Sequence, residues 1–455
     1  MATTLHTSDR SSSTMMLRHL LLCSIIILLY NVFVYDNTRK SADFEHFSCS
    51  KMPNKDGISH CMSGFLQGKH QGKSQLNKSP AIPATTNLTK EVIYTLKQAW
   101  RSARKGDKKK ATKLFVYAIR MAPRHPDVLN NYGEFLEHED VIQAEYYYTA
   151  ALSHYPYHQL ALSNRKRTLP LVQQIDRDRL ARIAAKRSKF YALPLTDPAL
   201  IRMKRESYYQ HVYHTVAIEG NTMNLQMTRA VIENRIAIGG KSVMEHNEII
   251  GMDEALSYIN TTLINKAGLL DVQDILQIHR RVYGFSDPFE AGNYRNSQVY
   301  IADHVPPPPG QVAAKMTEFD NWLKSSEARQ LHPIELAALA HYKLVHIHPF
   351  VDGNGRTARL FMNCILMRAG FPPIIIRVHD RFHYYQYLSQ ANDGDVRPFM
   401  RFIADTTEFT LDEYLNYTSV PAIIELNNAR RKKNDDVNTD VTISKESTPK
   451  GDDKK

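Results

Sequence analysis

The chain has 455 residues, of which 43% are hydrophobic and 23% are charged, and its formal net charge is +11. This composition is that of a globular protein with room for two or three domains. The excess positive charge lies in local runs, at residues 101–110 and 430–433, and no nucleic-acid-binding motif accompanies it, so we expect no nucleic-acid partner.

The first predicted element is a transmembrane signal-anchor over residues 20–36, preceded by a short cytoplasmic tail, residues 1–19. Its first sixteen residues carry no formal charge, although a membrane span needs about 20 residues. A signal-peptide core is the alternative, but no A-x-A-like cleavage site follows. Lysines and arginines do not decide the orientation. The sequons that follow favour a lumenal side and the secretory pathway, and they lie at Asn77, Asn87, Asn260 and Asn416.

Residues 37–89 are polar and are predicted to be a linker. They contain Cys49 and Cys61, which can form a disulfide in an oxidising compartment, and two free thiols are the alternative. Together with Cys23 and Cys364 they form no CxxC pair or metal-ligand cluster, which argues against a zinc site.

Residues 90–156 contain an internal repeat. Four positions recur 33 residues later: Ala111, Phe115, Ala118 and Pro123 correspond to Ala144, Tyr148, Ala151 and Pro156. Small residues let two antiparallel helices approach closely, and the proline ends the second helix. The pattern resembles two tetratricopeptide repeats, whose usual period is about 34 residues, and an ordinary helical hairpin is the alternative. Residues 157–193 are predicted to be a linker helix, interrupted at Pro170, that packs on the repeats.

Residues 194–420 are predicted to form a second, mainly helical domain, with a loop at residues 306–310 and strand-like character at residues 298–301. Residues 333–345 and 356–369 are its strongest helix candidates. The first of these opens with a proline, and Gly370 closes the second. Beyond this domain, residues 421–455 are charged and poor in aromatics, and are predicted to be a disordered tail.

The turn between these two helix candidates carries the most informative chemistry. It reads His348-Pro-Phe-Val-Asp-Gly-Asn-Gly-Arg-Thr-Ala-Arg359. The exposed N–H groups and the dipole of a helix N-terminus make an anion site, towards which Arg356 and Arg359 can both project. Asp352 is a hard oxygen ligand suited to Mg²⁺ held together with phosphates. The His348 imidazole can accept a proton.

This turn resembles the Fic signature, His-x-Phe-x-[Asp/Glu]-Gly-Asn-Gly-Arg-x-x-Arg, at every fixed position. The resemblance implies a protein adenylyltransferase that moves AMP from ATP onto a protein hydroxyl. His348 would deprotonate that hydroxyl, and Asp352 would hold Mg²⁺, with Mn²⁺ as an alternative. The nucleotide phosphates would be bound by Gly353, Asn354, Gly355, Arg356, Thr357, Ala358 and Arg359.

A second match lies upstream, at residues 215–221, which read Thr-Val-Ala-Ile-Glu-Gly-Asn. On a helix Thr215 and Glu219 share a face, and Gly220 stops the helix. The motif is similar to the inhibitory motif of the family, which implies that Glu219 pairs with Arg359 and occupies the γ-phosphate position. The resemblance also implies a second activity, hydrolytic removal of AMP, with Glu219 as a catalytic group. Ordinary helix-end chemistry is the alternative.

Two weaker regions complete the expected pocket. Residues 291–304 resemble the family's flap, a short β-hairpin that docks the target segment by strand addition. Its nucleotide-facing residues would be Ile301, Ala302, Asp303 and His304. Residues 381–395 resemble the segment that closes the adenine site, with Tyr384 and Asn392 as candidates. A core aromatic run is the alternative for the tyrosines of this segment.

The order of signal-anchor, repeat pair, inhibitory motif and catalytic core resembles the animal membrane-anchored Fic proteins. The expected fold is mainly α, with an all-helical core and a small β-hairpin flap. The resemblance implies a single-pass type II protein of the endoplasmic reticulum membrane with a lumenal catalytic domain. It also implies a BiP-type chaperone as client and a homodimer formed through the Fic domain. The alternatives are a Fic transferase of another phosphate-linked group, such as UMP or phosphocholine, and a membrane scaffold that acts through its repeats.

Overall fold

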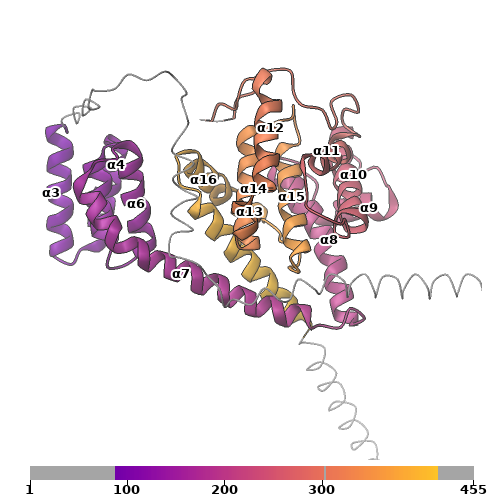
Figure 1. The fold of residues 1–455 in the computed structure, drawn as a ribbon, viewed down its shortest axis with the longest axis horizontal. Helices are drawn as coiled ribbons and strands as arrows, with labels where there is room; N and C mark the ends of the chain where they lie inside the picture. The colour runs from indigo at the N-terminus through magenta and orange to yellow at the C-terminus, as the bar shows by residue number, and fades with distance from the viewer. Residues whose placement is uncertain (1–87, 302–303, 419–455) are drawn as a thin grey trace, which may run out of the picture. The chain divides into compact units, whose positions relative to one another are not determined.

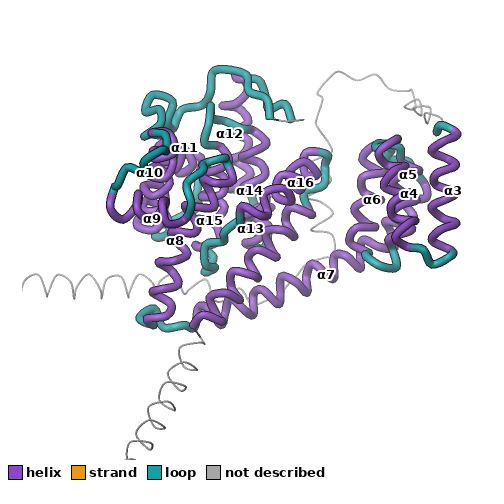
Figure 2. Tube along the Cα trace, turned by 180° about the vertical axis from the view of Figure 1, so that it is seen from behind, coloured by secondary structure: helices purple, strands orange, loops and turns teal. Residues whose placement is uncertain are grey.

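A computed structural model describes residues 88–301 and 304–418. Four predicted parts of the chain lie wholly or almost wholly outside the described residues. They are the cytoplasmic tail, the signal-anchor, nearly all of the linker and the C-terminal tail. Within the described ranges the regular secondary structure is helical, and no β-strand is drawn in Figure 2. No helix of the described part combines the length and the apolar character that a membrane span requires. The prediction of a mainly α protein is confirmed for these ranges.

Two helical hairpins open the described chain (Figure 1). The first joins α3 (Lys90–Arg104) to α4 (Lys108–Met121), and the second joins α5 (Pro126–Leu136) to α6 (Val141–His154). The repeated small and aromatic positions are fully buried in both hairpins: Ala111, Phe115, Ala118, Ala144, Tyr148 and Ala151. Gly133 lets α5 approach α6, because a Cβ there would lie 2.6 Å from a ring carbon of Tyr148. The hairpins are therefore equivalent units, and their assignment as tetratricopeptide repeats stays a prediction.

Local sequence explains where these helices begin. Side chains of Thr89, Asp107 and Asp140 accept hydrogen bonds from backbone N–H groups in the first turns of α3, α4 and α6. Helix α5 instead begins with Pro126, which has no N–H group to leave unsatisfied in a first turn.

Helix α7 (Gln159–Tyr191) follows the hairpins, and the predicted interruption at Pro170 is wrong. The helix continues through the proline, whose exposed ring lies on its solvent side. A proline removes one helical hydrogen bond, and packing on both sides of it offsets this loss. Ala161 and Val172 are buried on either side of the proline, and Ile183 belongs to the large core formed with the second domain.

The second domain surrounds the adjacent helices α14 (Pro333–Ile347) and α15 (Asn354–Arg368), which match the two predicted helices within two residues (Figure 1). Almost every residue of α15 from Asn354 to Leu366 is buried, as in a helix at the centre of a core. The other elements are α8 (Pro198–Ile218), α9 (Leu225–Asn234), α10 (Val243–Tyr258), η2 (Ile259–Leu263), α11 (Val272–Tyr283), α12 (Pro309–Leu323), α13 (Ser326–Gln330), η3 (Val378–Asp380), α16 (Arg381–Asn392) and a helix over residues 397–418.

The predicted β-hairpin flap is not confirmed. Among the described residues of this segment, only Ile301 and His304 form an isolated antiparallel bridge, and residues 302–303 lie outside the description. The four prolines at residues 306–309 have no N–H group, so they cannot donate to a strand ladder. The Gln298 side-chain amide donates to the carbonyls of Val299 and Pro306.

Candidate functional site

His348 lies directly after the last residue of α14, at the C-cap position. Its backbone is left-handed, with φ 51°, a conformation that is uncommon for residues other than glycine. A distant residue holds this turn: Arg295 Nε donates to the His348 carbonyl at 2.7 Å, and the Arg295 backbone N–H donates to the Pro349 carbonyl at 2.9 Å. The unusual turn is therefore stabilised by a residue of the predicted flap segment.

The imidazole of His348 is prepared to accept a proton on one nitrogen. Its Nδ1 lies 3.2 Å from the Val345 carbonyl. Because a carbonyl oxygen only accepts, Nδ1 carries the proton and Nε2 keeps its lone pair. Burial lowers the pKa of His348 to about 4, against the opposing effect of the Val345 hydrogen bond. The ring is therefore neutral at neutral pH, with a pKa below the ordinary value assumed from sequence.

The signature turn presents the N-terminus of α15. Gly353 is left-handed, with φ 74°, and no side chain caps the first turn of the helix, so its N–H groups remain available to an anion. Asn354 Nδ2 donates to the Phe350 carbonyl and its Oδ1 accepts from the Phe350 N–H, both at 2.9 Å. This side chain thus braces the loop. Thr357 and Ala358 are fully buried within α15.

His279 on α11 supports the turn from behind, and sequence reasoning missed it. The Gly292 N–H donates to His279 Nδ1 at 2.9 Å, so Nε2 carries the proton and donates to the Asp352 carbonyl at 2.9 Å. Its ring stacks on Phe350 with centroids 3.7 Å apart. Burial lowers the pKa of His279 to about 4, which keeps it in this neutral form. A histidine in an amphipathic helix gives no sequence signal for such a role.

Arg356 and Arg359 are each 2% exposed. Arg356 Nη2 donates to Asp352 Oδ2 at 2.8 Å, and Arg359 Nη2 donates to Glu219 Oε1 at 2.6 Å and to the Thr215 carbonyl at 3.0 Å. The Nε atoms of both arginines are buried without a hydrogen-bond partner in the described part of the chain. Buried, unsatisfied donors on two cations beside a helix N-terminus fit an anionic ligand with several oxygens.

Glu219 is brought to Arg359 by the end of α8. The helix stops at Ile218, Glu219 is its C-cap, and Gly220 is left-handed with φ 111°. The predicted end of this helix is confirmed. Gly355 makes room for the pair, since a Cβ there would overlap Glu219 Oε1 and lie 3.0 Å from Arg359 Nη1. The carboxylate therefore lies against the first turn of α15.

Glu248 on α10 is a further acidic group that sequence reasoning missed. Its Oε1 lies 3.4 Å from Arg356 Nη1, and its Oε2 accepts from Asn221 Nδ2 at 2.8 Å. Burial raises the pKa of Glu248, an effect that Arg356 and Asn221 oppose. Asn221 is the last residue of the upstream motif, so this contact ties that motif to the signature arginine.

The residues around Asp352 fit a magnesium ion that arrives with phosphates. Within the described ranges no three His, Cys, Asp or Glu side chains are grouped as a metal site. Asp352 is 59% exposed at its side chain and uses one oxygen for Arg356. Mg²⁺ is commonly held by one or two carboxylates, waters and substrate phosphates, and this single exposed carboxylate meets that requirement.

The flap segment reaches α14 through His304. His304 Nε2 lies 2.8 Å from the His346 carbonyl, and the two rings lie 4.4 Å apart. Arg295, another residue that sequence reasoning missed, is 2% exposed and fastens both ends of this segment, because its Nη1 and Nη2 donate to the carbonyls of Ser297 and Pro307. Ala302 and Asp303 lie outside the described residues.

The two adenine-site candidates lie on α16 in different surroundings. Tyr384 is 1% exposed and its hydroxyl lies 3.0 Å from His341 Nε2 and 3.4 Å from Arg359 Nη1. Asn392 Oδ1 lies 2.9 Å from His346 Nδ1. Tyr384 is thus packed in the core behind Arg359, and the neighbouring Tyr385, which is 41% exposed, lies at Glu219. The adenine role of Tyr384 and Asn392 stays a prediction.

The assembled site joins four chemical capacities. The neutral imidazole of His348 can take a proton, and the N-terminus of α15 with its two buried guanidinium groups can bind phosphates. The exposed carboxylate of Asp352 can hold a divalent cation. The carboxylate of Glu219 occupies the guanidinium of Arg359. Such an arrangement suits transfer at phosphorus, in which catalysis is largely positioning and stabilisation of phosphate charge.

Comparison with known proteins relates the chain to a named group. The Fic/DOC family matches residues 269–366. "Protein adenylyltransferase Fic" of Nematostella vectensis is 54% identical over 330 residues, which are 72% of this chain and 77% of that protein. The protein of the same name from Drosophila melanogaster is 51% identical over 347 residues, 75% of this chain and 70% of that protein. The solved structure of Fic-1 (residues 134–508) from C. elegans is 42% identical, with a TM-score of 0.65, over 73% of this chain and 99% of that one.

Proposed function

The chain belongs to the Fic family of protein adenylyltransferases, and from this premise we propose that it moves AMP from ATP onto a Ser or Thr hydroxyl of a client protein under restraint by Glu219. The observation that carries the proposal is the 2.6 Å contact of Glu219 with Arg359 beside the neutral His348. The base, His348, and the arginine that Glu219 occupies, Arg359, both belong to the signature segment, residues 348–359.

Transfer follows from the roles of the residues. The hydroxyl of the client gives its proton to His348 Nε2 while its oxygen bonds to the α-phosphorus, and the bond from that phosphorus to the β-bridging oxygen breaks to release diphosphate. Arg356, Arg359 and the first N–H groups of α15 bind the phosphate oxygens. Asp352 would hold Mg²⁺, which neutralises charge on the phosphates when bound.

Restraint by Glu219 follows from competition for Arg359. A carboxylate and a phosphate oxygen seek the same guanidinium donors, and Glu219 already takes the shortest contact to that group. ATP then binds without its γ-phosphate in place, so the α-phosphorus is not aligned with the hydroxyl. Because Glu219 is 28% exposed at its side chain, rotation away from Arg359 needs no opening of the core.

The same carboxylate supports the reverse process, removal of AMP. Glu219 would take a proton from a water whose oxygen bonds to the phosphorus of the AMP–protein diester. The bond from that phosphorus to the client oxygen breaks, AMP is released, and the client oxygen takes a proton that His348 passes on from solvent. One group would thus inhibit transfer and assist hydrolysis.

The wider setting of the enzyme extends this proposal by resemblance. We place it in the endoplasmic reticulum membrane with a lumenal catalytic domain and a BiP-type chaperone as client. The two hairpins would be tetratricopeptide repeats, and the Fic domain would form a homodimer. The four sequons after the predicted anchor support the lumenal side.

The test is Glu219→Gly in the full chain with labelled ATP, Mg²⁺ and a purified lumenal chaperone. We expect transfer to rise at least tenfold and removal of AMP from a pre-modified client to fall, because Arg359 is freed and the water-orienting carboxylate is lost. Adding His348→Ala should abolish both reactions. Unchanged labelling in Glu219→Gly would contradict restraint, and labelling that persists in His348→Ala would contradict the role of His348 as the base. Absence of both reactions in every variant would favour a scaffold. A panel of UTP and cytidine-linked donors distinguishes another cargo.

A further inference from the structure

Two adjacent tyrosines on α16 contact the two halves of the Arg359–Glu219 pair. The Tyr384 hydroxyl lies 3.4 Å from Arg359 Nη1, and the Tyr385 hydroxyl donates to Glu219 Oε2 at 3.4 Å. Glu219 uses its other oxygen for Arg359. We propose that Tyr384 and Tyr385 are positioning residues: Tyr384, backed by His341, holds Arg359 in the phosphate site, and Tyr385 holds Glu219 on Arg359. This inference rests on the proposed function, and it names the residues that hold Glu219 and Arg359 in the restrained arrangement.

The contacts behind Tyr384 have one consistent direction. A guanidinium group only donates, so the Tyr384 oxygen accepts from Arg359 and its own hydrogen is directed to His341 Nε2, 3.0 Å away. Tyr384 and His341 are 1% and 0% exposed, which leaves little room for either to move. Burial lowers the pKa of His341 to about 3, so the ring stays a neutral acceptor. Arg359 is thus held from its inner side by a rigid neutral pair.

Tyr385 is placed to act as a releasable contact. It is 41% exposed, and the Arg381 guanidinium lies 5.7 Å from its ring centroid. Its hydroxyl contact with Glu219 is long for O–H···O⁻, whereas the Glu219–Arg359 contact is 2.6 Å. The ion pair therefore supplies most of the restraint, and Tyr385 biases the carboxylate towards the paired position.

The test compares Tyr385→Phe and Tyr384→Phe in the wild-type chain and in Glu219→Gly, with Tyr387→Phe as the control. Tyr387 lies on the same helix and packs against Phe402. Rates of labelling are measured across ATP concentrations, and melting temperature is recorded for every variant. Loss of one weak hydrogen bond changes an equilibrium about two- to fivefold.

We expect Tyr385→Phe to raise transfer about two- to fivefold in wild type and to slow AMP removal, with a much smaller effect on transfer in Glu219→Gly. Tyr384→Phe should raise the KM for ATP in both backgrounds, because Arg359 is less well placed. Equal effects of Tyr385→Phe in both backgrounds would overturn its assignment to Glu219, and an unchanged KM in Tyr384→Phe would overturn its assignment to Arg359. Failure of the proposed function is distinguishable, since Glu219→Gly alone would then not raise transfer.

Discussion

His348 combines a left-handed backbone with a buried ring, and both depend on hydrogen bonds to carbonyl groups. Arg295 donates to the carbonyl of His348, and His348 Nδ1 donates to the carbonyl of Val345. The Arg295 contact stabilises the turn, and the Val345 contact places the ring proton on Nδ1. Together they aim a single unprotonated nitrogen, which is the requirement for a base that acts once per transfer.

The pH dependence of transfer follows from the state of this ring. Because the pKa of His348 is lowered to about 4, the base is deprotonated throughout the range above about pH 5. In Glu219→Gly, which also removes a carboxylate that favours the charged ring, we expect the rate to be flat from pH 8 to pH 6 and to fall only as pH approaches 4. Single-turnover labelling, with circular dichroism as a check on folding, measures this profile. An inflection near the ordinary histidine pKa of about 6.5 would contradict it.

At the scale of secondary-structure elements, the site is a meeting of helix ends. Helix α8 ends at Glu219, α14 ends before His348, and α15 begins just after Gly353. Helix ends leave backbone groups unpaired and reverse the chain sharply, so they can offer N–H groups and differently directed side chains within a small volume. The residues of the site therefore lie at helix ends, where the regular backbone hydrogen bonds of the helices stop.

Arg295 links these helix ends to the flap segment, and its side chain donates to three carbonyls, with no acidic partner among the described residues. Arg295→Lys keeps the charge and removes the planar fork, so two of the three bonds are lost. In the Glu219→Gly background we expect transfer to fall at least tenfold and stability to fall by about 1–3 kcal/mol. Labelling rate and thermal unfolding measure these changes. Arg329→Lys is the control, because that exposed side chain donates to the carbonyl of Ser325 within its own helix turn. Equal behaviour of the two variants would refute the role of Arg295.

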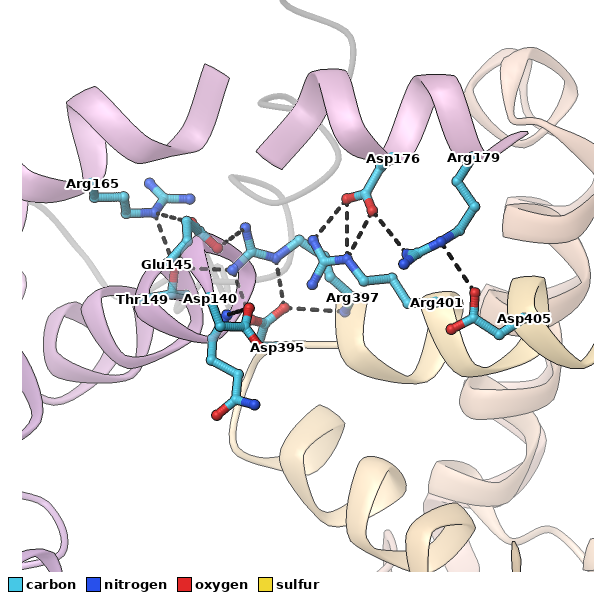
Figure 3. A network of polar contacts seen from close by, with 11 residues as sticks. Asp140, Glu145, Thr149, Arg165, Asp176, Arg179, Asp395, Arg397, Arg401 and Asp405 are labelled. Atoms are coloured by element: carbon cyan, nitrogen blue, oxygen red, sulfur yellow. Dashed lines mark hydrogen bonds and ion pairs between the residues drawn. The ribbon is translucent and has the colours of Figure 1, made fainter. Parts of the chain in front are cut away.

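At the scale of the described molecule, buried charges join the hairpins to the second domain (Figure 3). Arg397 Nη1 lies 2.6 Å from Glu145 Oε2 on α6, and its Nε and Nη2 each lie 2.7 Å from an oxygen of Asp395. Glu145 is fully buried and also accepts from Arg165 on α7. Further along α7, Asp176 pairs with Arg401 at 2.7 Å. The helix over residues 397–418 is thus fastened to α6 and α7.

Removing the central cation of this network should be costly. Arg397→Met leaves Asp395 buried without the arginine that pairs with it and leaves Glu145 with Arg165 alone, and breaking one side of a buried pair costs about 3–5 kcal/mol. Arg182→Met is the matched control, because it breaks a pair with Glu408 whose arginine is 55% exposed, and exposed pairs contribute about 0–1 kcal/mol. Urea denaturation of the full chain compares the two. If both variants unfold at the same urea concentration, the network does not stabilise this junction.

Much of the fold could be predicted from sequence because it is encoded locally. Proline at the start of α14, glycine after α15 and the buried small residues of α4 and α6 act within their own helices. The interruption predicted at Pro170 is wrong because the lost helical hydrogen bond is a local effect, whereas the packing that offsets this loss comes from both neighbouring domains. The flap hairpin is predicted by resemblance to the family over residues 291–304, and only the bridge between Ile301 and His304 forms in the described residues, directly before four successive prolines that cannot donate to a ladder.

The sequence by itself determined the chemistry of the turn from His348 to Arg359 and the presence of Glu219, because those groups act through their identity and short spacing. Only the tertiary structure decided how they are held. His279, Arg295, Glu248, His341 and Tyr385 reach the site across long sequence separations, 73 residues for His279 and Asp352 and 166 for Tyr385 and Glu219. Such residues carry no local pattern, since burial and direction of hydrogen bonding arise only when helices pack.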